Sequence, residues 1–290
     1  MMKSKLIVPM TVLCGILLIG YCLAVTVNIQ NDRFKEQHSN KLASTTSNIL
    51  LKRFDCPEGF IRQKASSSSF QTWLRNVPLK NDGAAVHLFD GSLKGNQTIH
   101  EVVLAFDVGS SDLQQCADAV MRLRAEYLYQ KKAYDSIVFT FTNGTKAHYS
   151  KWRQGYRAQV SGNNVSWVKK AAIDTSYACF RKYMNTVFMY CGTYSLSKEL
   201  TSISIGQIKG GDVFIHGGFP GHAMIVMDVA IHPTTNKKVF MLAQSYMPAQ
   251  DIHIVKNNLD EELSPWYEIP ENGSLDTPEW TFEVAELKRF

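Results

Sequence analysis

The sequence predicts an α+β domain in which helices come first and a mainly antiparallel sheet follows. Hydrophobic residues make up 45% of the 290 residues, which is enough for a packed core and excludes a mainly disordered chain. The last third is a series of apolar runs separated by turn residues, which is typical of strands. A run of helices followed by a run of strands indicates the α+β class.

The first 25 residues are predicted to be a signal peptide or a membrane anchor. Lys3 and Lys5 precede about twenty uncharged and largely apolar residues, as in export signals. Cleavage after Ala24 fits the pattern, and the run is also long enough to stay as one spanning helix. Residues 26–53 are polar and predict a flexible linker, which leaves residues 54–290 as a single globular domain. We therefore expect an exported protein of the periplasm or cell envelope.

The charge balance argues against a nucleic-acid partner. The formal net charge is +5, from 31 basic and 26 acidic residues, and losing Lys3 and Lys5 with the signal would leave +3. Contact with a membrane is expected through the N-terminal segment only.

Several segments in the first half of the globular chain have clear local signals. "SSSSFQTWLRNVPL" predicts a capped helical turn, and "AAVHLFDG" and "IHEVVLAFDVG" predict strands. In "SSDLQQCADAVMRLRAEYLYQKK" apolar residues recur at helical spacing. Ser111 to Gln114 fits a capping box, so the helix is expected to begin at Ser111 with Cys116 in its second turn.

The rest of the chain is expected to be richer in strands. "IVFTFTNG", "YRAQV" and "NNVSWVKK" predict strands around the segment "YSKWRQGYR", and a helix through Cys179 should end near Gly192. Four further strands are expected at residues 213–215, 223–229, 239–244 and 252–255.

The strand that begins at His222 is expected to be central, because both of its faces are mostly apolar. Period-two alternation would put His222, Met224, Val226 and Asp228 on one face. If "HPTTN" closes a hairpin, the register puts Met247 opposite His222, with Gln244 and Ser245 close by.

Three side chains in this pattern fit catalysis by cysteine, which needs a thiol, a base and a group that orients the base. Cys116 is placed near a helix start, where a thiol pKa is lowered. His222 follows a glycine-rich loop, which we expect to leave an open groove beside the imidazole. The amide oxygen of Gln244 can accept from an imidazole N–H. Gln115 or the Cys116 backbone N–H could stabilise an oxyanion, and this chemistry needs neither a metal nor another cofactor.

Structural roles for the same residues stay open. Cys116 could pack in the core or form a disulfide with Cys56, and His222 could be a structural histidine. Cys179 and Cys191 lie about 18 Å apart along one helix and cannot bond to each other. A zinc site built from His216, His222 and Asp228 is disfavoured, because Asp228 would lie about 20 Å along the strand from His222. Asp118 and Arg122, one helical turn apart, are expected to pair.

Two loops carry candidate substrate contacts. Trp152, Arg153 and Tyr156 in "YSKWRQGYR" and Tyr246 in "QSYMPAQD" could stack on sugars or bind carboxylates. Plain packing is the alternative for these aromatic and basic side chains.

The order of these motifs resembles that of CHAP amidases, which are papain-like cell-wall peptidases. "QQC" before a helix, "GDVFI", "GHAMIV" and a third polar residue match that pattern at Cys116, His222 and Gln244. The longer gap between Cys116 and His222 implies an insertion. The resemblance implies a papain-like domain with an antiparallel sheet and packed helices. It also implies a thiol hydrolase or amidase acting on peptidoglycan stem peptides or another envelope peptide or glycan.

A closer resemblance covers nearly the whole globular chain. "DLQQCADAVMRLRAEYLY", "YSKWRQGYR" and "LAQSYMPAQDIH" are typical of domain of unknown function 4846, a family of exported bacterial proteins without an established activity. The alternative to an enzyme is therefore a non-catalytic envelope protein of the same fold that binds glycan or peptide.

Overall fold

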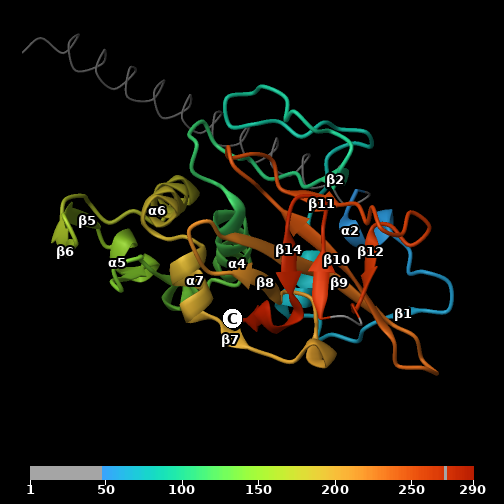
Figure 1. Cartoon of the computed structure of the whole chain (residues 1–290). Helices are drawn as coiled ribbons and strands as arrows, with labels where there is room; N and C mark the ends of the chain where they lie inside the picture. The colour runs from blue at the N-terminus through green and yellow to red at the C-terminus, as the bar shows by residue number, and fades with distance from the viewer. Residues whose placement is uncertain (1–47, 271–272) are drawn as a thin grey trace, which may run out of the picture. The chain divides into compact units, whose positions relative to one another are not determined.

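The computed structural model describes residues 48–270 and 273–290 (Figure 1). The predicted signal or anchor segment, and the predicted linker up to residue 47, lie outside the described residues. In the part of the chain that is described, no helix has the length and apolar character needed to span a bilayer.

One antiparallel sheet organises the domain. Nine of the described strands belong to it, in the order β2-β11-β10-β9-β8-β15-β7, with β1 pairing to β9 and β12 pairing to β10. These strands are β1 (Ile61–Arg62), β2 (His100–Val103), β7 (Thr201–Ser202), β8 (Val213–His216), β9 (His222–Ile231), β10 (Lys238–Gln244), β11 (His253–Val255), β12 (Trp266–Glu268) and β15 (Leu287–Arg289).

Helices and small hairpins complete the fold. The helices of the described part of the chain are α2 (Leu50–Arg53), α3 (Phe70–Arg75), α4 (Cys116–Gln130), α5 (Tyr149–Arg153), α6 (Tyr177–Tyr190) and α7 (Thr193–Glu199), with 3₁₀ turns η1 (Tyr134–Ser136), η2 (Ile205–Gln207) and η3 (Val284–Glu286). The described residues also form three two-stranded hairpins: β3 (Val138–Thr140) with β4 (Lys146–His148), β5 (Tyr156–Ser161) with β6 (Asn164–Lys169), and β13 (Ser274–Asp276) with β14 (Thr281–Glu283).

The two faces of the sheet bury different clusters. Ala223 and Ile225 of β9 pack in the cluster that contains the helices α3, α4 and α6. Met224 and Val226 point the other way, into a smaller cluster that contains Phe282 of the β13–β14 hairpin. Strand β9 is therefore covered on both faces, as its apolar sequence predicts.

The α+β class is confirmed, with differences in single elements. The strands expected in the last third correspond to β8, β9, β10 and β11, and Ser69 caps α3 by accepting from the Thr72 N–H. The strand expected at "AAVHLFDG" is wrong, because the chain turns there and forms only two isolated bridges, His87 to Leu93 and Leu88 to Gln250. The sequence reading also missed β12, β13, β14 and β15.

Helix α4 begins at Cys116, so the expected start at Ser111 is wrong. The chain turns before the helix, where the Leu113 N–H donates to the Ser111 carbonyl over 2.8 Å. The Asp118 carboxylate accepts from the Gln115 N–H over 3.1 Å, which is the reciprocal half of a capping box at the later position. Cys116 is thereby the first residue of the helix.

A β-bulge divides strand β9. Met241 pairs with Asp228 but Leu242 pairs with Val226, so Met227 is an extra residue in β9. Continuing the register places Tyr246, rather than the expected Met247, level with His222. The bulge also reverses the side-chain alternation, because Met227 and Ala230 lie in the helix-side cluster and Val229 in the other. Asp228 therefore does not share the face of His222, and it binds Arg62 and Arg75 instead, over 2.7 and 2.5 Å.

The folded chain includes residues that the sequence assigns to the linker. Leu50 in α2 is fully buried, and the Asn48 side chain donates to the carbonyls of Leu79 and Lys80. All four cysteines of the described chain are free thiols, so no disulfide joins Cys56 to Cys116.

Candidate active site at the start of strand β9

A row of polar side chains crosses three neighbouring strands beside the β13–β14 hairpin. His222 Nε2 lies 2.8 Å from Gln244 Oε1. The other end of the amide, Gln244 Nε2, lies 2.7 Å from the Glu279 carboxylate and 3.3 Å from His253 Nε2. His222, Gln244 and His253 are all buried, with at most 1% of each exposed.

The positions of the protons in this row follow from the groups that can only accept hydrogen bonds. A carboxylate can only accept, so the Gln244 atom facing Glu279 must be the NH₂ group. The Gln244 oxygen then faces His222, whose Nε2 must carry the proton. His253 Nδ1 donates to the Asp251 carbonyl over 2.9 Å, which leaves His253 Nε2 free to accept from Gln244.

Both histidines of the row are held neutral. Burial lowers the pKa of His222 to about 4, although the bond to Gln244 opposes the shift. Burial also lowers the pKa of His253 to about 3. At neutral pH the His222 imidazole therefore has an unprotonated Nδ1, which is the form that can act as a base.

Aromatic rings surround the His222 imidazole. The ring centroids of Tyr246, Trp280 and Phe282 lie 5.0, 5.4 and 5.8 Å from that of His222. Trp280 and Phe282 come from the β13–β14 hairpin, which covers this face of the sheet (Figure 1). Tyr246 was expected among the substrate contacts, and the structure brings it beside the candidate base.

Cys116 reaches the same strand end from helix α4. The backbone N–H of Ala223, the residue after His222, is near enough to the sulfur to lower its pKa. Burial outweighs this effect and, with the nearby Asp118, raises the pKa of the Cys116 thiol to about 11. The side chain is 9% exposed. Within the described residues, no hydrogen bond joins the sulfur to the His222 imidazole, so the resting pair is a thiol and a neutral imidazole.

Asp118 is a buried acid in the first turn of helix α4. One carboxylate oxygen accepts from the Gln115 N–H, and the other has no partner among the described residues. Burial raises the pKa of Asp118 well above its usual range. The expected pair with Arg122 is wrong, because Arg122 binds Glu126 over 2.6 Å.

The glycine-rich loop does not leave the open groove that the sequence predicts. A Cβ on Gly221 would lie 2.3 Å from Thr193 Oγ1, and one on Gly217 would lie 2.5 Å from Ser197 Cβ. Thr193 also donates to the Gly218 carbonyl over 3.1 Å. The glycines instead let the loop pack tightly against α7, and His222 is 1% exposed beneath it.

Two glutamines precede the cysteine. The Gln115 side chain donates to Asp112 over 3.0 Å at the outside of the helix start. Gln114 is fully buried, and its side-chain nitrogen has no hydrogen-bond partner among the described residues. Ser245 Oγ donates to the Gln114 carbonyl over 2.9 Å, which ties this turn to the end of β10.

The remaining expected substrate contacts lie elsewhere. Trp152 is 5% exposed, and the Arg157 guanidinium stacks on its ring at 4.1 Å. Arg153 lies 4.1 Å from the Tyr134 ring, and Lys151 lies 5.2 Å from that of Tyr156. Figure 1 shows α5 and β5, which carry these residues, beside α6 at one end of the domain. They pack there and are not part of the row at His222.

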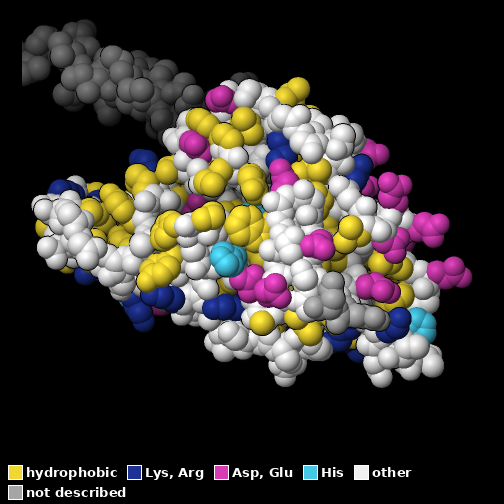
Figure 2. Space-filling view, viewed as in Figure 1, with side chains coloured by type: hydrophobic (Ala, Val, Ile, Leu, Met, Phe, Trp, Pro, Cys, Tyr) yellow, Lys and Arg dark blue, Asp and Glu magenta, His cyan; other side chains and the backbone are white. Residues whose placement is uncertain are grey.

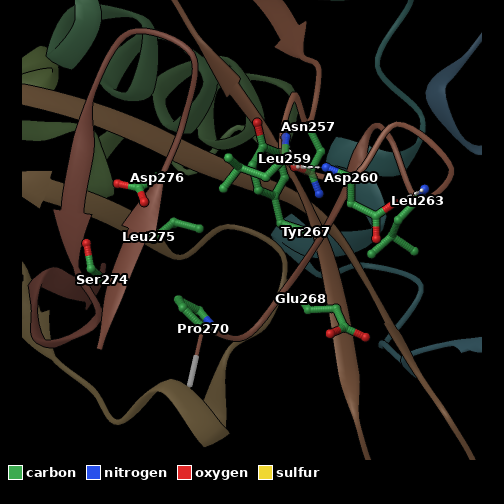
Figure 3. Close-up of a pocket in the computed structure, with 10 residues that line it drawn as sticks. All are labelled: Asn257, Leu259, Asp260, Leu263, Tyr267, Glu268, Pro270, Ser274, Leu275 and Asp276. Atoms are coloured by element: carbon green, nitrogen blue, oxygen red, sulfur yellow. Dashed lines mark hydrogen bonds between the residues drawn. The ribbon is translucent and has the colours of Figure 1, made fainter. Parts of the chain in front are cut away.

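A pocket of about 470 Å³ opens between the β11–β12 loop and the β13–β14 hairpin (Figure 3). Asp260, Glu268 and Asp276 contribute carboxylates to its lining, and Figure 2 shows acidic side chains gathered on the side of the domain where β12 lies. Its lining includes neither Cys116 nor His222. No group of three or more acidic, histidine or cysteine side chains in the described residues is arranged to hold a metal ion.

Sequence reasoning missed several residues of the row. Glu279 binds Gln244 and also binds Lys94 over 2.7 Å, and His253 contacts the same amide. "DTPEWTFE" contains a turn signal and alternating residues that could have predicted a strand at Thr281. No local signal places that hairpin over β9.

The family model for "Domain of unknown function (4846)" matches residues 50–289. No curated protein and no solved structure matches the chain. Because the family model spans almost all of the described chain, the protein belongs to the family of domain of unknown function 4846.

Proposed function

We propose that the protein is a thiol hydrolase or amidase that cleaves an amide bond in a cell-envelope polymer. The observation that carries the proposal is the meeting of three groups at the start of β9. His222 is held through Nε2 by Gln244, its Nδ1 is unprotonated at neutral pH, and the Cys116 sulfur lies near the backbone N–H of Ala223.

The residues divide the chemistry as follows. Cys116 Sγ attacks the amide carbonyl as His222 Nδ1 removes the thiol proton, and the same nitrogen returns that proton to the leaving amine. Water then hydrolyses the thioester and regenerates the thiol. Gln244 keeps the imidazole oriented, and the Cys116 N–H at the helix start supplies an oxyanion donor.

The substrate class comes from the resemblance to CHAP amidases. The order Gln-Cys, Gly-Asp and Gly-His in this chain is similar to theirs, and it favours a papain-like fold and peptidoglycan stem peptides as substrate. The apolar N-terminal segment supports export to the envelope, where that polymer lies.

Labelling of Cys116 by iodoacetamide tests the pairing. If His222 activates the thiol, wild-type Cys116 reacts at least tenfold faster than in His222→Ala at pH 7. Cys56, a half-buried free thiol in the same protein, is the internal control and reacts equally in both. A muropeptide digestion assay with wild type and Cys116→Ala tests the hydrolase activity itself.

A second candidate is a non-catalytic protein that binds envelope glycan or peptide. It is favoured by the burial of Cys116 and His222 and by the lack of a hydrogen bond between these described side chains. An unassisted thiol with a pKa of about 11 reacts about tenfold faster for each pH unit up to that value. Three results together would support binding over catalysis. These are a labelling rate that rises this steeply with pH, equal labelling of Cys116 in wild type and His222→Ala, and no digestion of muropeptides.

A further inference from the structure

We propose that Glu279 is a positioning residue that fixes the proton of the His222 imidazole on Nε2 and so makes Nδ1 the basic nitrogen. The inference rests on the proposed function for its catalytic meaning. The position of the His222 proton can be measured whether or not the protein is an enzyme.

The Gln244 amide could face His222 with either its oxygen or its nitrogen. Turned one way, the oxygen accepts from a proton on His222 Nε2. Turned the other way, the NH₂ group donates to an unprotonated Nε2, and the proton moves to Nδ1. A histidine with its proton on Nδ1 has no lone pair there to receive the thiol proton.

Glu279 decides between the two orientations. Its carboxylate lies 2.7 Å from Gln244 Nε2, and an acceptor-only group at that distance excludes the amide oxygen. His253 Nε2 also favours the NH₂ group, but at 3.3 Å and without charge. Hydrogen bonds to ionised groups are roughly twice as strong as neutral ones, so Glu279 has the larger influence.

Lys94 holds the carboxylate in place from the other side. Its Nζ lies 2.7 Å from the second Glu279 oxygen, with side-chain exposures of 9% for Lys94 and 18% for Glu279. Each carboxylate oxygen thus has one donor. The row from Lys94 through Glu279 and Gln244 to His222 has a single consistent arrangement of donors and acceptors.

The variant Glu279→Gln should reverse this row. Lys94 can only donate, so it takes the amide oxygen at position 279 and leaves the NH₂ group facing Gln244. Gln244 then turns its oxygen toward position 279 and its NH₂ toward His222. The His222 proton shifts to Nδ1, with His253 opposing the change.

The measurement is the ¹⁵N spectrum of the histidine rings in the full chain labelled with ¹⁵N-histidine. His222 is assigned by the signal lost in His222→Gln. In wild type we expect Nε2 to show the protonated shift and Nδ1 the unprotonated shift, and in Glu279→Gln we expect the two shifts to exchange in at least half of the molecules.

Glu286→Gln is the matched control. Glu286 lies in η3, close in sequence to Glu279, and its carboxylate is 2.6 Å from His216 Nδ1 with 22% of the side chain exposed. The same chemical change there should alter the His216 signal and leave that of His222 unchanged. Adding Lys94→Glu to Glu279→Gln is the rescue, because the introduced carboxylate accepts from the NH₂ at position 279 and restores the wild-type row.

A wild-type spectrum in which His222 carries its proton on Nδ1 would overturn the proposal. This measurement uses the wild-type protein alone, so it does not depend on the folding of any variant. A His222 signal that stays Nε2-protonated in folded Glu279→Gln would also overturn it. Under the proposed function, iodoacetamide labelling of Cys116 should also fall about 10- to 100-fold in Glu279→Gln, by analogy with the loss on removing the hydrogen-bond partner of a metal-binding histidine. A proton shift without any His222-dependent labelling would support the positioning role and count against the hydrolase.

Discussion

Acidification is expected to destabilise the domain through its buried histidines. The folded pKa of His222 is lowered to about 4, whereas an unfolded histidine titrates near 6.5. Above pH 6.5 both states are neutral and the domain has its full stability. As the pH falls from 6.5 toward 4 the unfolded chain alone takes the proton, so stability is lost through this window and the loss levels off below it.

The two pKa values give the size of the effect. Between pH 7 and pH 5, linkage predicts a loss of about 2 kcal/mol in the free energy of unfolding from His222. His253, with its pKa lowered to about 3, contributes a similar loss of about 2 kcal/mol. Together they take a large share of the 5–15 kcal/mol that is typical of a folded domain.

Urea unfolding at pH 7 and pH 5 measures these losses. The decrease in unfolding free energy should be about 2 kcal/mol smaller in His222→Gln than in wild type. His148→Gln, at an exposed histidine, is the control and should keep the wild-type decrease. An equal decrease in His222→Gln and wild type would refute the claim that His222 is buried in its neutral form.

Three further changes test other parts of the structure. Asp118→Asn removes a buried acid whose pKa is raised, so urea unfolding at pH 7 should show a free energy of unfolding about 1–3 kcal/mol higher than that of wild type, and this gain should disappear below pH 4. Iodoacetamide should also label Cys116 faster in this variant, because Asp118 raises the pKa of the thiol, and an unchanged labelling rate would contradict the proximity of the two groups. Leu50→Ala should cost about 2–5 kcal/mol in the same assay, since Leu50 is fully buried, whereas a loss below 0.5 kcal/mol, roughly the range of surface substitutions, would show that the domain begins later. Asp228→Asn leaves Arg75 without its buried partner and should cost about 3–5 kcal/mol, and a neutral result would exclude a structural role for this ion pair.

The sequence predicted the central hairpin because its signals are local. The apolar run after His222 and the turn "HPTTN" determine β9, β10 and their pairing, and so the structure brings Gln244 to His222 as expected. Near the turn, the observed pairing of β9 with β10 matches the expected register. Beyond the bulge at Met227, the observed register differs from the expected one by one residue. A bulge has no simple sequence signature, since it depends on how both strands twist in the sheet.

The outer part of the site could not be predicted in this way. Glu279 and Lys94 are 185 residues apart and meet only because two separate loops fold over the same strands. The three-residue strands β13 and β14 are too short for a periodic pattern, and their position depends on the packing of Phe282 from β14 against Phe214 and Met224 of the sheet. The start of α4 was misplaced because two overlapping capping patterns exist, and Asp118 forms the one that is used.

Because of the extra residue in β9, the polar side chains of His222 and Asp228 point to opposite faces of the sheet. An unbroken alternation through Met227 would put Asp228 on the hairpin side of the sheet, the face that His222 shares, and away from its two arginine partners. With the bulge, Asp228 instead forms ion pairs with Arg62 and Arg75, while His222 and Gln244 face the β13–β14 hairpin. The bulge therefore lets a ten-residue strand keep a buried carboxylate beside two arginines on one side while its first residue, His222, faces the hairpin on the other.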